Sequence, residues 1–148
     1  MITIREAIAS DCDAIEACAH AAYQVYIDII GKAPAPMQAD FNSHIAAAQV
    51  IVMLNIKQLV GYAVYTSKDD DIQLENIAID PVFQSQGLGR RLIESIHALA
   101  REKGYKAVAL YTNEKMTENL DWYNKLGYTE TDRRHEDGFD RVYFRKQI

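Results

Sequence analysis

Two glycines stand at the start of the most regular helical pattern in the chain, within the segment Gln84-Ser85-Gln86-Gly87-Leu88-Gly89. Glycine has no side chain, so the free backbone N–H groups at a helix start can approach an anion closely. The positive end of the helix dipole adds to the attraction. Arg90 and Arg91 follow at once, and guanidinium groups suit phosphate. The segment therefore predicts a site for a diphosphate.

Two better-known phosphate motifs do not fit this segment. A dinucleotide-binding fingerprint would need a third glycine at position 92, which is Leu92. A nucleotide-binding P-loop would need a Gly-Lys-Ser or Gly-Lys-Thr triplet, and the chain has neither. The remaining alternative is a glycine turn that only packs a helix closely on a sheet.

The hydrophobic pattern predicts one domain of strands and helices over residues 1–148. Hairpins and one β-α-β crossover favour a mixed, mostly antiparallel central sheet flanked by helices, an α/β or α+β fold. Ser10 and Asp13 resemble a capping box that opens the first helix. Strands are expected at residues 2–7, 50–56, 58–66, 72–79, 107–111, 128–132 and 141–145. Helices are expected at residues 10–22, 37–48, 117–126 and, with the clearest apolar repeat, from Leu88 to a stop at Gly104.

The glycine segment resembles the pyrophosphate loop of the GNAT superfamily of N-acetyltransferases. The family pattern is Gln/Arg-x-x-Gly-x-Gly/Ala, and Gln84, Gly87 and Gly89 meet it after Asp80-Pro81. The stretch Glu118–Tyr128 is similar to the second signature of the family. The order of the elements matches too, so the resemblance extends over essentially the whole chain. It implies a single GNAT-type domain.

The resemblance implies acetyl-coenzyme A as cosubstrate and indicates which residues would hold it. Backbone groups of Ile77, Ala78 and Ile79 would meet the pantetheine arm and the acetyl carbonyl, and Asn119 would bond the coenzyme arm. Ser85 departs from the family, in which many members carry glycine at this position. The residues that would wrap the pyrophosphate are Gln84, Gln86, Gly87, Leu88, Gly89 and Arg90.

Acyl transfer from a thioester to an amine needs a neutral amine, a stabilised oxyanion and a proton for the leaving thiolate. Tyr123, which the resemblance sets near the thioester sulfur, is the candidate proton donor; a packing role is its alternative. Glu75 is the candidate base, acting through water. Strand alternation sets it on one face with Ile77 and Ile79, where it would be partly desolvated. A rim position or a contact to a substrate ammonium is the alternative, and His135 is a weaker base candidate.

A covalent enzyme intermediate is not expected, because neither Cys12 nor Cys18 has an evident activating partner. Direct attack in a ternary complex is favoured instead. The two thiols are expected to stay reduced, since their spacing on one helix puts them far apart around it. Without histidines at ligand spacing they also make a poor zinc site, so no metal is expected.

The acceptor amine cannot be named from the residues. Tyr23, Tyr26 and Met37 flank a proline-containing break, where GNAT relatives usually build the acceptor pocket. Aromatic rings beside the carboxylate of Asp28 would suit an ammonium group. A small molecule, a peptide, a protein N-terminus and a lysine all stay open as acceptors. A non-catalytic module that binds or senses acyl-CoA is the other alternative, and it would not need the two candidate catalytic residues.

The bulk composition narrows the partners and the location. The formal net charge of −5 disfavours broad electrostatic binding to nucleic acid. No apolar run approaches the roughly 20 residues that span a bilayer, so no membrane is expected. The first residues lack the order of a signal peptide, which favours a cytoplasmic location. A homodimer could form across the last strands, which carry Tyr128, Val142, Tyr143 and Phe144.

Overall fold

The computed structural model describes residues 1–148, and its seven strands form one mixed sheet in the order β1-β2-β3-β4-β5-β7-β6. Strands β4 and β5 run parallel, whereas the pairs β1–β2, β2–β3, β5–β7 and β6–β7 are antiparallel. The predicted mixed, mostly antiparallel sheet with helices is confirmed. The strands are β1 (Ile2–Glu6), β2 (Val50–Asn55), β3 (Gln58–Lys68), β4 (Asp71–Ile79), β5 (Ala107–Asn113), β6 (Thr129–Glu136) and β7 (Phe139–Gln147).

Five α-helices and three short 3-10 helices connect these strands. The longest, α4, links the parallel strands β4 and β5, as a crossover connection must. Gly104 follows it with φ of 81°, so the predicted glycine stop is confirmed. The helices are α1 (Cys12–Tyr23), α2 (Val25–Ile30), α3 (Phe41–Ala46), α4 (Leu88–Glu102) and α5 (Thr117–Lys125), with η1 (Ala9–Asp11), η2 (Ala35–Gln38) and η3 (Pro81–Phe83).

The helical region before β2 differs from the sequence prediction in three places. The first helix begins at Cys12 behind η1, where the Asp11 carboxylate accepts the Ile8 N–H at 2.8 Å; the predicted Ser10–Asp13 capping box is wrong. Helix α2 was not predicted, and it ends at Gly31 with φ of 90°. The helix predicted from residue 37 begins only at Phe41, behind η2.

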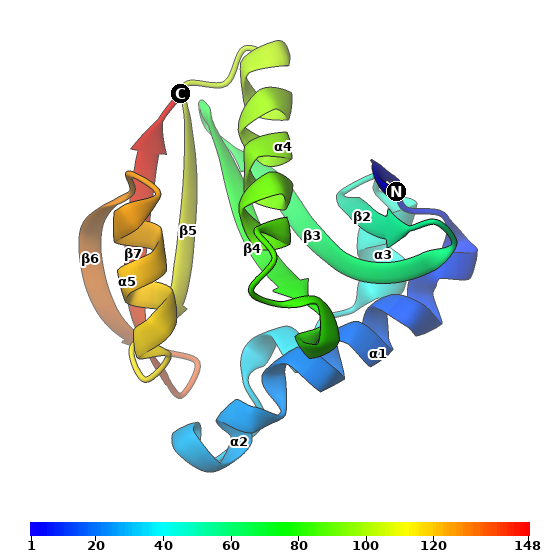
Figure 1. Cartoon of the computed structure of the whole chain (residues 1–148). Coiled ribbons are helices and arrows are strands. Elements are labelled where there is room, and N and C mark those ends of the chain that lie inside the picture. The colour runs from blue at the N-terminus through cyan, green and yellow to red at the C-terminus, as the bar shows by residue number, and fades with distance from the viewer. The chain divides into compact units, whose positions relative to one another are not determined.

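The chain divides into two compact units, each made of separate chain segments. The first contains residues 1–65 and 75–95, and the second contains residues 66–74 and 96–148. Because β3, β4 and α4 run from one unit into the other, neither unit is a separate stretch of sequence. The blue and cyan part of Figure 1 shows α1, α2 and α3 of the first unit. In its core the Phe41 ring packs edge-on against Tyr62, with centroids 5.4 Å apart.

The second unit packs α5 onto β6 and β7 (Figure 1). Its core contains Val108, Leu110, Val142 and Phe144, all at most 2% exposed. Strand β6 is the last of the sheet order, and its side chains are charged or polar and nearly all exposed. Such residues discourage edge-to-edge strand pairing, so this edge does not support the predicted homodimer, which stays a prediction.

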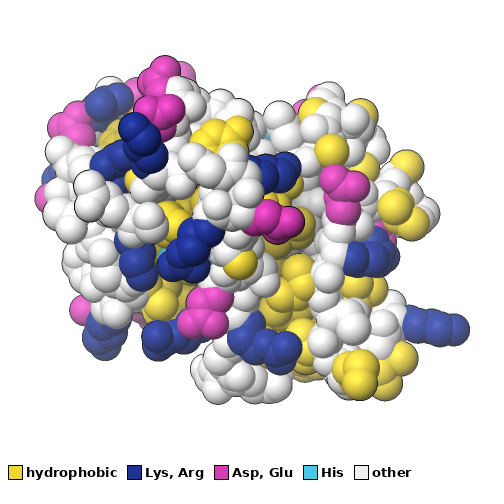
Figure 2. Space-filling model, turned by 90° about the horizontal axis from the view of Figure 1, so that it is seen from above, with side chains coloured by type: hydrophobic (Ala, Val, Ile, Leu, Met, Phe, Trp, Pro, Cys, Tyr) yellow, Lys and Arg dark blue, Asp and Glu magenta, His cyan; other side chains and the backbone are white.

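Two surface properties accompany this fold. Basic and acidic side chains are interspersed on the face that Figure 2 displays, with apolar side chains between them. No helix combines the length and the apolar character that crossing a membrane requires.

Candidate active site

The loop that follows β4 is held to the end of that strand by two side chains. Asp80 accepts the Val82 N–H at 3.0 Å and so opens η3. Gln84 donates from Nε2 to the Ile79 carbonyl at 3.0 Å, and its own N–H donates to Pro81 at 3.3 Å. Gln84 therefore donates from both its side chain and its backbone within the loop, and these two bonds pin the loop in place.

Two left-handed residues follow Gln84, and we call this turn the cradle because it is the candidate site for an anion. Ser85 and Gly87 both lie in the left-handed region, with φ of 65° and 75°. Alternation of left- and right-handed residues turns successive N–H groups toward one side. A Cβ added to Gly87 would meet nothing within 4 Å, so the space above it is open. This geometry fits a diphosphate.

Helix α4 supplies further donors. Arg91 donates its N–H to Gly87 at 3.2 Å, which closes the first turn. The N–H groups of Leu88, Gly89 and Arg90 precede it and have no intrahelical acceptor, as at every helix start. Leu88 is 6% exposed and anchors this turn in the core. The anion site predicted from the glycines stays a prediction, and the two left-handed residues and the helix start fit it.

The glycine-segment residues differ in what they contribute. Gly89 is the second residue of α4, and its backbone is not left-handed. Its backbone conformation therefore does not require glycine, and what the glycine contributes is the space that a side chain would fill. Arg90 is exposed and pairs with Glu94 at 3.1 Å. Gln86 is also exposed, between the two left-handed residues.

The stretch Ile77-Ala78-Ile79 presents its backbone groups alternately to the two edges of β4. Asp80 donates its N–H to Val60 of β3 at 2.8 Å, so Ile77 and Ile79 face the edge away from β3. On that edge the Ile77 carbonyl accepts the Tyr23 hydroxyl at 2.6 Å, and Gln84 takes the Ile79 carbonyl. The two carbonyls have internal partners, which leaves the N–H groups as the candidates for contacting a ligand.

Glu75 lies on β4 in the first unit. Strand alternation sets it on the half-buried side together with Ile77, while its neighbours Leu74 and Asn76 are buried on the other side. The predicted common face of Glu75 and Ile77 is confirmed. Ile79, two residues further, is 9% exposed.

Tyr123 lies on α5 in the second unit and is 5% exposed. Three aromatic rings surround it, with centroids at 5.1 Å for Trp122 and 5.7 Å for both Tyr128 and Phe144. Burial raises the pKa of Tyr123 well above its usual value. The hydroxyl therefore keeps its proton at neutral pH and can donate a hydrogen bond or a proton.

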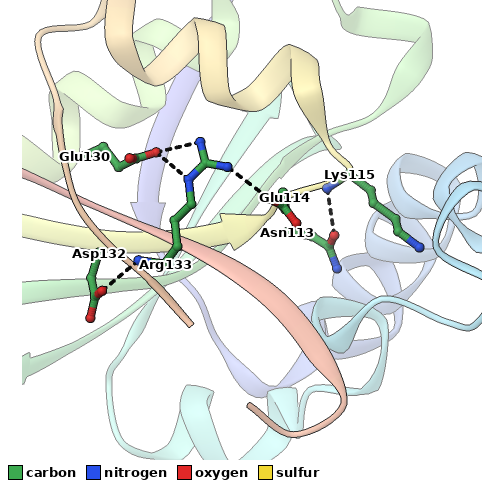
Figure 3. Close-up of polar contacts among 6 residues, drawn as sticks. All are labelled: Asn113, Glu114, Lys115, Glu130, Asp132 and Arg133. Atoms are coloured by element: carbon green, nitrogen blue, oxygen red, sulfur yellow. Dashed lines mark hydrogen bonds and ion pairs between the residues drawn. The ribbon is translucent and has the colours of Figure 1, made fainter. Parts of the chain in front are cut away.

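The turn before α5 is fixed by polar contacts that Figure 3 displays. Asn113 accepts the Lys115 N–H at 2.9 Å. Arg133 of β6 bridges Glu130 and Glu114, at 2.9 and 3.0 Å. These contacts set where α5 begins, and with it the positions of the helix residues that follow.

Asn119, on the first turn of α5, is used partly by the protein itself. Its Nδ2 donates to Thr112 Oγ1 at 3.3 Å and lies 3.5 Å from the sulfur of Met116. The side-chain nitrogen therefore ties α5 to β5. A bond from Asn119 to a coenzyme arm would use the amide oxygen.

A pocket of about 760 Å³ opens beside the residues 21–28, which we call the pocket wall. The acceptor role of Tyr23, Tyr26 and Met37 stays a prediction, and none of the three lines this pocket. Tyr23 turns its hydroxyl to β4, and Tyr26 and Met37 are half-buried outside the pocket lining. The side chains that line the pocket are Ala21, Ala22, Gln24, Val25, Ile27, Asp28, Pro81 and Gln84.

Sequence reasoning missed Asn76, whose side chain is 5% exposed. Its Oδ1 accepts the Tyr62 hydroxyl at 2.8 Å, and its Nδ2 donates to the Pro36 carbonyl at 3.2 Å. A signal was present, because Asn76 is a polar residue at a core position of the strand, in step with Leu74 and Ala78.

Three further candidates for chemistry are two thiols and one imidazole. Cys12 and Cys18 are buried free thiols. Burial raises the pKa of Cys18 to about 12, which keeps it protonated and poorly nucleophilic. His135 is exposed and its ring nitrogen lies 2.7 Å from Asp140.

Comparison with known proteins bears on the same region. A family model described as an acetyltransferase (GNAT) domain matches residues 46–130. The [Ribosomal protein bS18]-alanine N-acetyltransferase of Haemophilus influenzae is 33% identical over 84 residues, 53% of this chain and 57% of that protein. The thialysine N-epsilon-acetyltransferase of Bos taurus is 28% identical over 141 residues, 85% of this chain and 83% of that protein. The chain thus spans about half the length of the first of these relatives.

Solved structures share the fold. The PaiA N-acetyltransferase of Thermoplasma acidophilum, in complex with coenzyme A, superposes with a TM-score of 0.85 at 16% identity, covering 100% of this chain and 99% of that one. The ribosomal-protein-S18-alanine N-acetyltransferase of Escherichia coli gives 0.75 at 21% identity, with 100% and 94% covered. The family model covers more than half of the chain, and the chain belongs to the GNAT acetyltransferase family.

Proposed function

We propose that this protein is an acetyl-CoA-dependent N-acetyltransferase that transfers the acetyl group to an amine by direct attack in a ternary complex. The observation that carries the proposal is the cradle at Ser85 and Gly87, with open space above it and a helix start behind it. Named relatives that acetylate amines, and a structural neighbour that holds coenzyme A, support the same activity.

Acetyl-coenzyme A, when bound, supplies an activated acyl thioester. The N–H groups of Leu88, Gly89 and Arg90 would receive its pyrophosphate, aided by the dipole of α4. The N–H groups of Ile77 and Ile79, on the edge of β4 away from β3, would receive the pantetheine arm and polarise the acetyl carbonyl. We assign these contacts to the N–H groups because the Ile77 and Ile79 carbonyls already accept hydrogen bonds from Tyr23 and Gln84.

Two side chains would move protons. The Tyr123 hydroxyl stays protonated because burial raises its pKa, so it can donate to the thiolate as it leaves. Glu75, on the half-buried side of β4, would take a proton from the acceptor amine through a water molecule. A protein that only binds or senses acyl-CoA would need neither group.

The acceptor is an amine, either a small molecule or a peptide. One relative is named for an alanine of a ribosomal protein and another for thialysine, so relatives of both kinds exist. The pocket wall presents the carboxylate of Asp28, which suits an ammonium group near the acceptor. The proposal includes a cytoplasmic location for the enzyme.

The test combines binding and turnover on the full chain. Calorimetry measures acetyl-CoA affinity, and thiol release measures transfer to a panel of small amines, lysine peptides and peptides with free N-termini. Gly89→Val should weaken acetyl-CoA binding at least tenfold, because its side chain would occupy the approach of the phosphate. Ala98→Val adds the same branched side chain at an exposed site of α4 and should bind like the wild type. Binding without thiol release for any amine would establish the non-catalytic alternative and overturn the proposal.

A further inference from the structure

A buried polar cluster joins three segments of the first unit to β4. Its centre is the Asn76 amide, at 5% exposure, beside Tyr62 at 0% and Tyr23 at 8%. Asn76 Oδ1 accepts from the Tyr62 hydroxyl at 2.8 Å and lies 3.5 Å from the Tyr23 hydroxyl. Asn76 Nδ2 donates to the Pro36 carbonyl at 3.2 Å. The partners come from α1, β3 and η2, so one side chain connects elements far apart in sequence.

An apolar residue in place of Asn76 would remove the hydrogen bonds that Asn76 makes to the Tyr62 hydroxyl and the Pro36 carbonyl. A buried polar group that loses its partner keeps its desolvation penalty, so the cluster favours one arrangement of its segments over slightly shifted ones. The same burial raises the pKa of Tyr62, whose hydroxyl therefore stays a donor. The cluster therefore holds α1, β3, η2 and β4 in one fixed alignment.

The segments that the cluster holds are those around the pocket. Tyr23 lies within residues 21–28 without lining the pocket, and its neighbours Ala22 and Gln24 do line it. The Tyr23 hydroxyl also donates to the Ile77 carbonyl at 2.6 Å. Pro36 precedes Met37 in η2. Asn76 itself follows Glu75 on β4 and points to the opposite side of the strand. The cluster therefore fixes the pocket wall and η2 relative to the strand that carries the proposed base.

We propose that Asn76 is a positioning residue for the acceptor amine. By holding the pocket wall and η2 on β4, it sets the distance between a bound acceptor and Glu75 without touching either the acceptor or the coenzyme. This inference rests on the proposed acetyltransferase function and adds to it the residue that determines acceptor fit.

The main variant is Asn76→Leu, which keeps the approximate size and removes both hydrogen-bonding groups. We expect the KM for the acceptor to rise about tenfold, while the acetyl-CoA Kd stays within about twofold. The reason is that the cluster residues belong to α1, β3, η2 and β4, whereas Ser85 and Gly87 lie in the loop between η3 and α4. An unchanged acceptor KM, or an equal loss of acetyl-CoA affinity, would overturn the proposal.

A milder matched pair covers the case in which Asn76→Leu does not fold. Tyr62→Phe removes one hydroxyl from the cluster. Tyr65→Phe removes a hydroxyl of the same strand that bonds to the Ala48 carbonyl at 3.4 Å, outside the cluster. The acceptor KM should rise in the first variant and not in the second. An equal acceptor KM in the two variants would show that the Tyr62 hydroxyl contributes only to stability, and it would overturn the positioning role.

Hydrogen exchange separates this inference from the proposed function, because it needs no turnover. Amides of residues 24–39 should exchange faster in Asn76→Leu or Tyr62→Phe than in the wild type, and those of the second unit should not. If the wild type acetylates no amine, the proposed function fails on that result. Unchanged exchange over residues 24–39 overturns the positioning role in either case.

Discussion

Ser85 and Gly87 share a left-handed backbone, with φ of 65° and 75°, and only Gln86 separates them. Two such residues in close succession form the anion cradle ahead of α4. One of them has a side chain, and a left-handed conformation costs an L-residue about 1–2 kcal/mol. The loop therefore stores strain at Ser85 and avoids it at Gly87.

The first prediction concerns these two positions. Gly87→Ala should lower acetyl-CoA affinity and destabilise the protein by about 1 kcal/mol, because alanine resists the left-handed conformation. Gly104→Ala is the control, since Gly104 is also left-handed, at φ of 81°, but follows the other end of α4. It should lose similar stability and keep its affinity. Ser85→Gly should bind acetyl-CoA at least as well as the wild type. Calorimetry and thermal unfolding measure both quantities, and wild-type affinity in Gly87→Ala would refute the cradle.

The second prediction concerns Tyr123. Tyr123→Phe keeps the ring among Trp122, Tyr128 and Phe144 and removes only the hydroxyl. If that hydroxyl serves the leaving thiolate, kcat should fall by about 10²-fold, the low end for general acid catalysis. Acetyl-CoA affinity should stay nearly constant, because the interaction strengthens only in the transition state. Steady-state kinetics with calorimetry is the measurement. A kcat within about twofold of the wild type would assign Tyr123 to packing.

The strands and the long helix were predictable because their signals are local. The apolar repeat of α4 and its glycine stop are readable from consecutive residues, as is the turn at Lys57, although the turn also takes in Ile56, which was expected in the strand. The predicted strand at residues 128–132 was too short, since β6 continues to Glu136. That strand is charged and almost wholly exposed, so no hydrophobic alternation marks its extent.

The candidate site was predictable only in part, because contacts between distant segments leave no periodic trace. The glycine pattern indicated an anion site in this loop, but not that Gln84 would pin the loop to Ile79. The aromatic residues near the break indicated an acceptor region, but not that Tyr23 would turn to Ile77. Both contacts depend on where the chain returns in space, which a single sequence does not encode locally.

The third prediction concerns stability in acid. Arg145 donates two bonds to the Asp71 carboxylate, at 2.9 and 3.0 Å. The bond from Arg145 lowers the pKa of Asp71. An aspartate whose folded pKa is lowered stabilises the fold above its unfolded value of about 3.9, and that contribution is lost as the pH falls through the folded pKa.

Asp71→Asn removes this ion pair. At pH 7 it should lower the free energy of unfolding by up to about 1 kcal/mol, the range of partly exposed pairs. The difference from the wild type should shrink as the pH falls below about 4, because Asp71 then becomes neutral in both the unfolded and the folded protein. Urea unfolding from pH 7 to pH 3 measures the two curves. A difference that stays constant over this range would show that the ion pair contributes nothing to stability.

The last prediction separates Glu75 as a base from Glu75 as an ammonium-binding carboxylate. An acceptor amine with a lysine-like pKa near 10 is mostly protonated at neutral pH, so a proton must leave before or during attack. Glu75→Gln keeps the shape of the side chain and cannot accept that proton. If Glu75 is the base, kcat at pH 7 should fall by about 10²-fold or more. Raising the pH should partly restore the rate, because more of the acceptor is then neutral without help.

Steady-state kinetics from pH 6 to pH 10, with the acceptor concentration varied at each pH, give kcat and the acceptor KM and so distinguish the outcomes. Asp28→Asn provides the comparison, since Asp28 lines the pocket and lies on α2 rather than on β4. It should raise the acceptor KM without changing kcat, as expected for loss of uniform binding. A Glu75→Gln enzyme that behaves in the same way would make Glu75 a second ammonium contact. A wild-type rate and pH profile would remove Glu75 from the reaction altogether and leave water to take the proton.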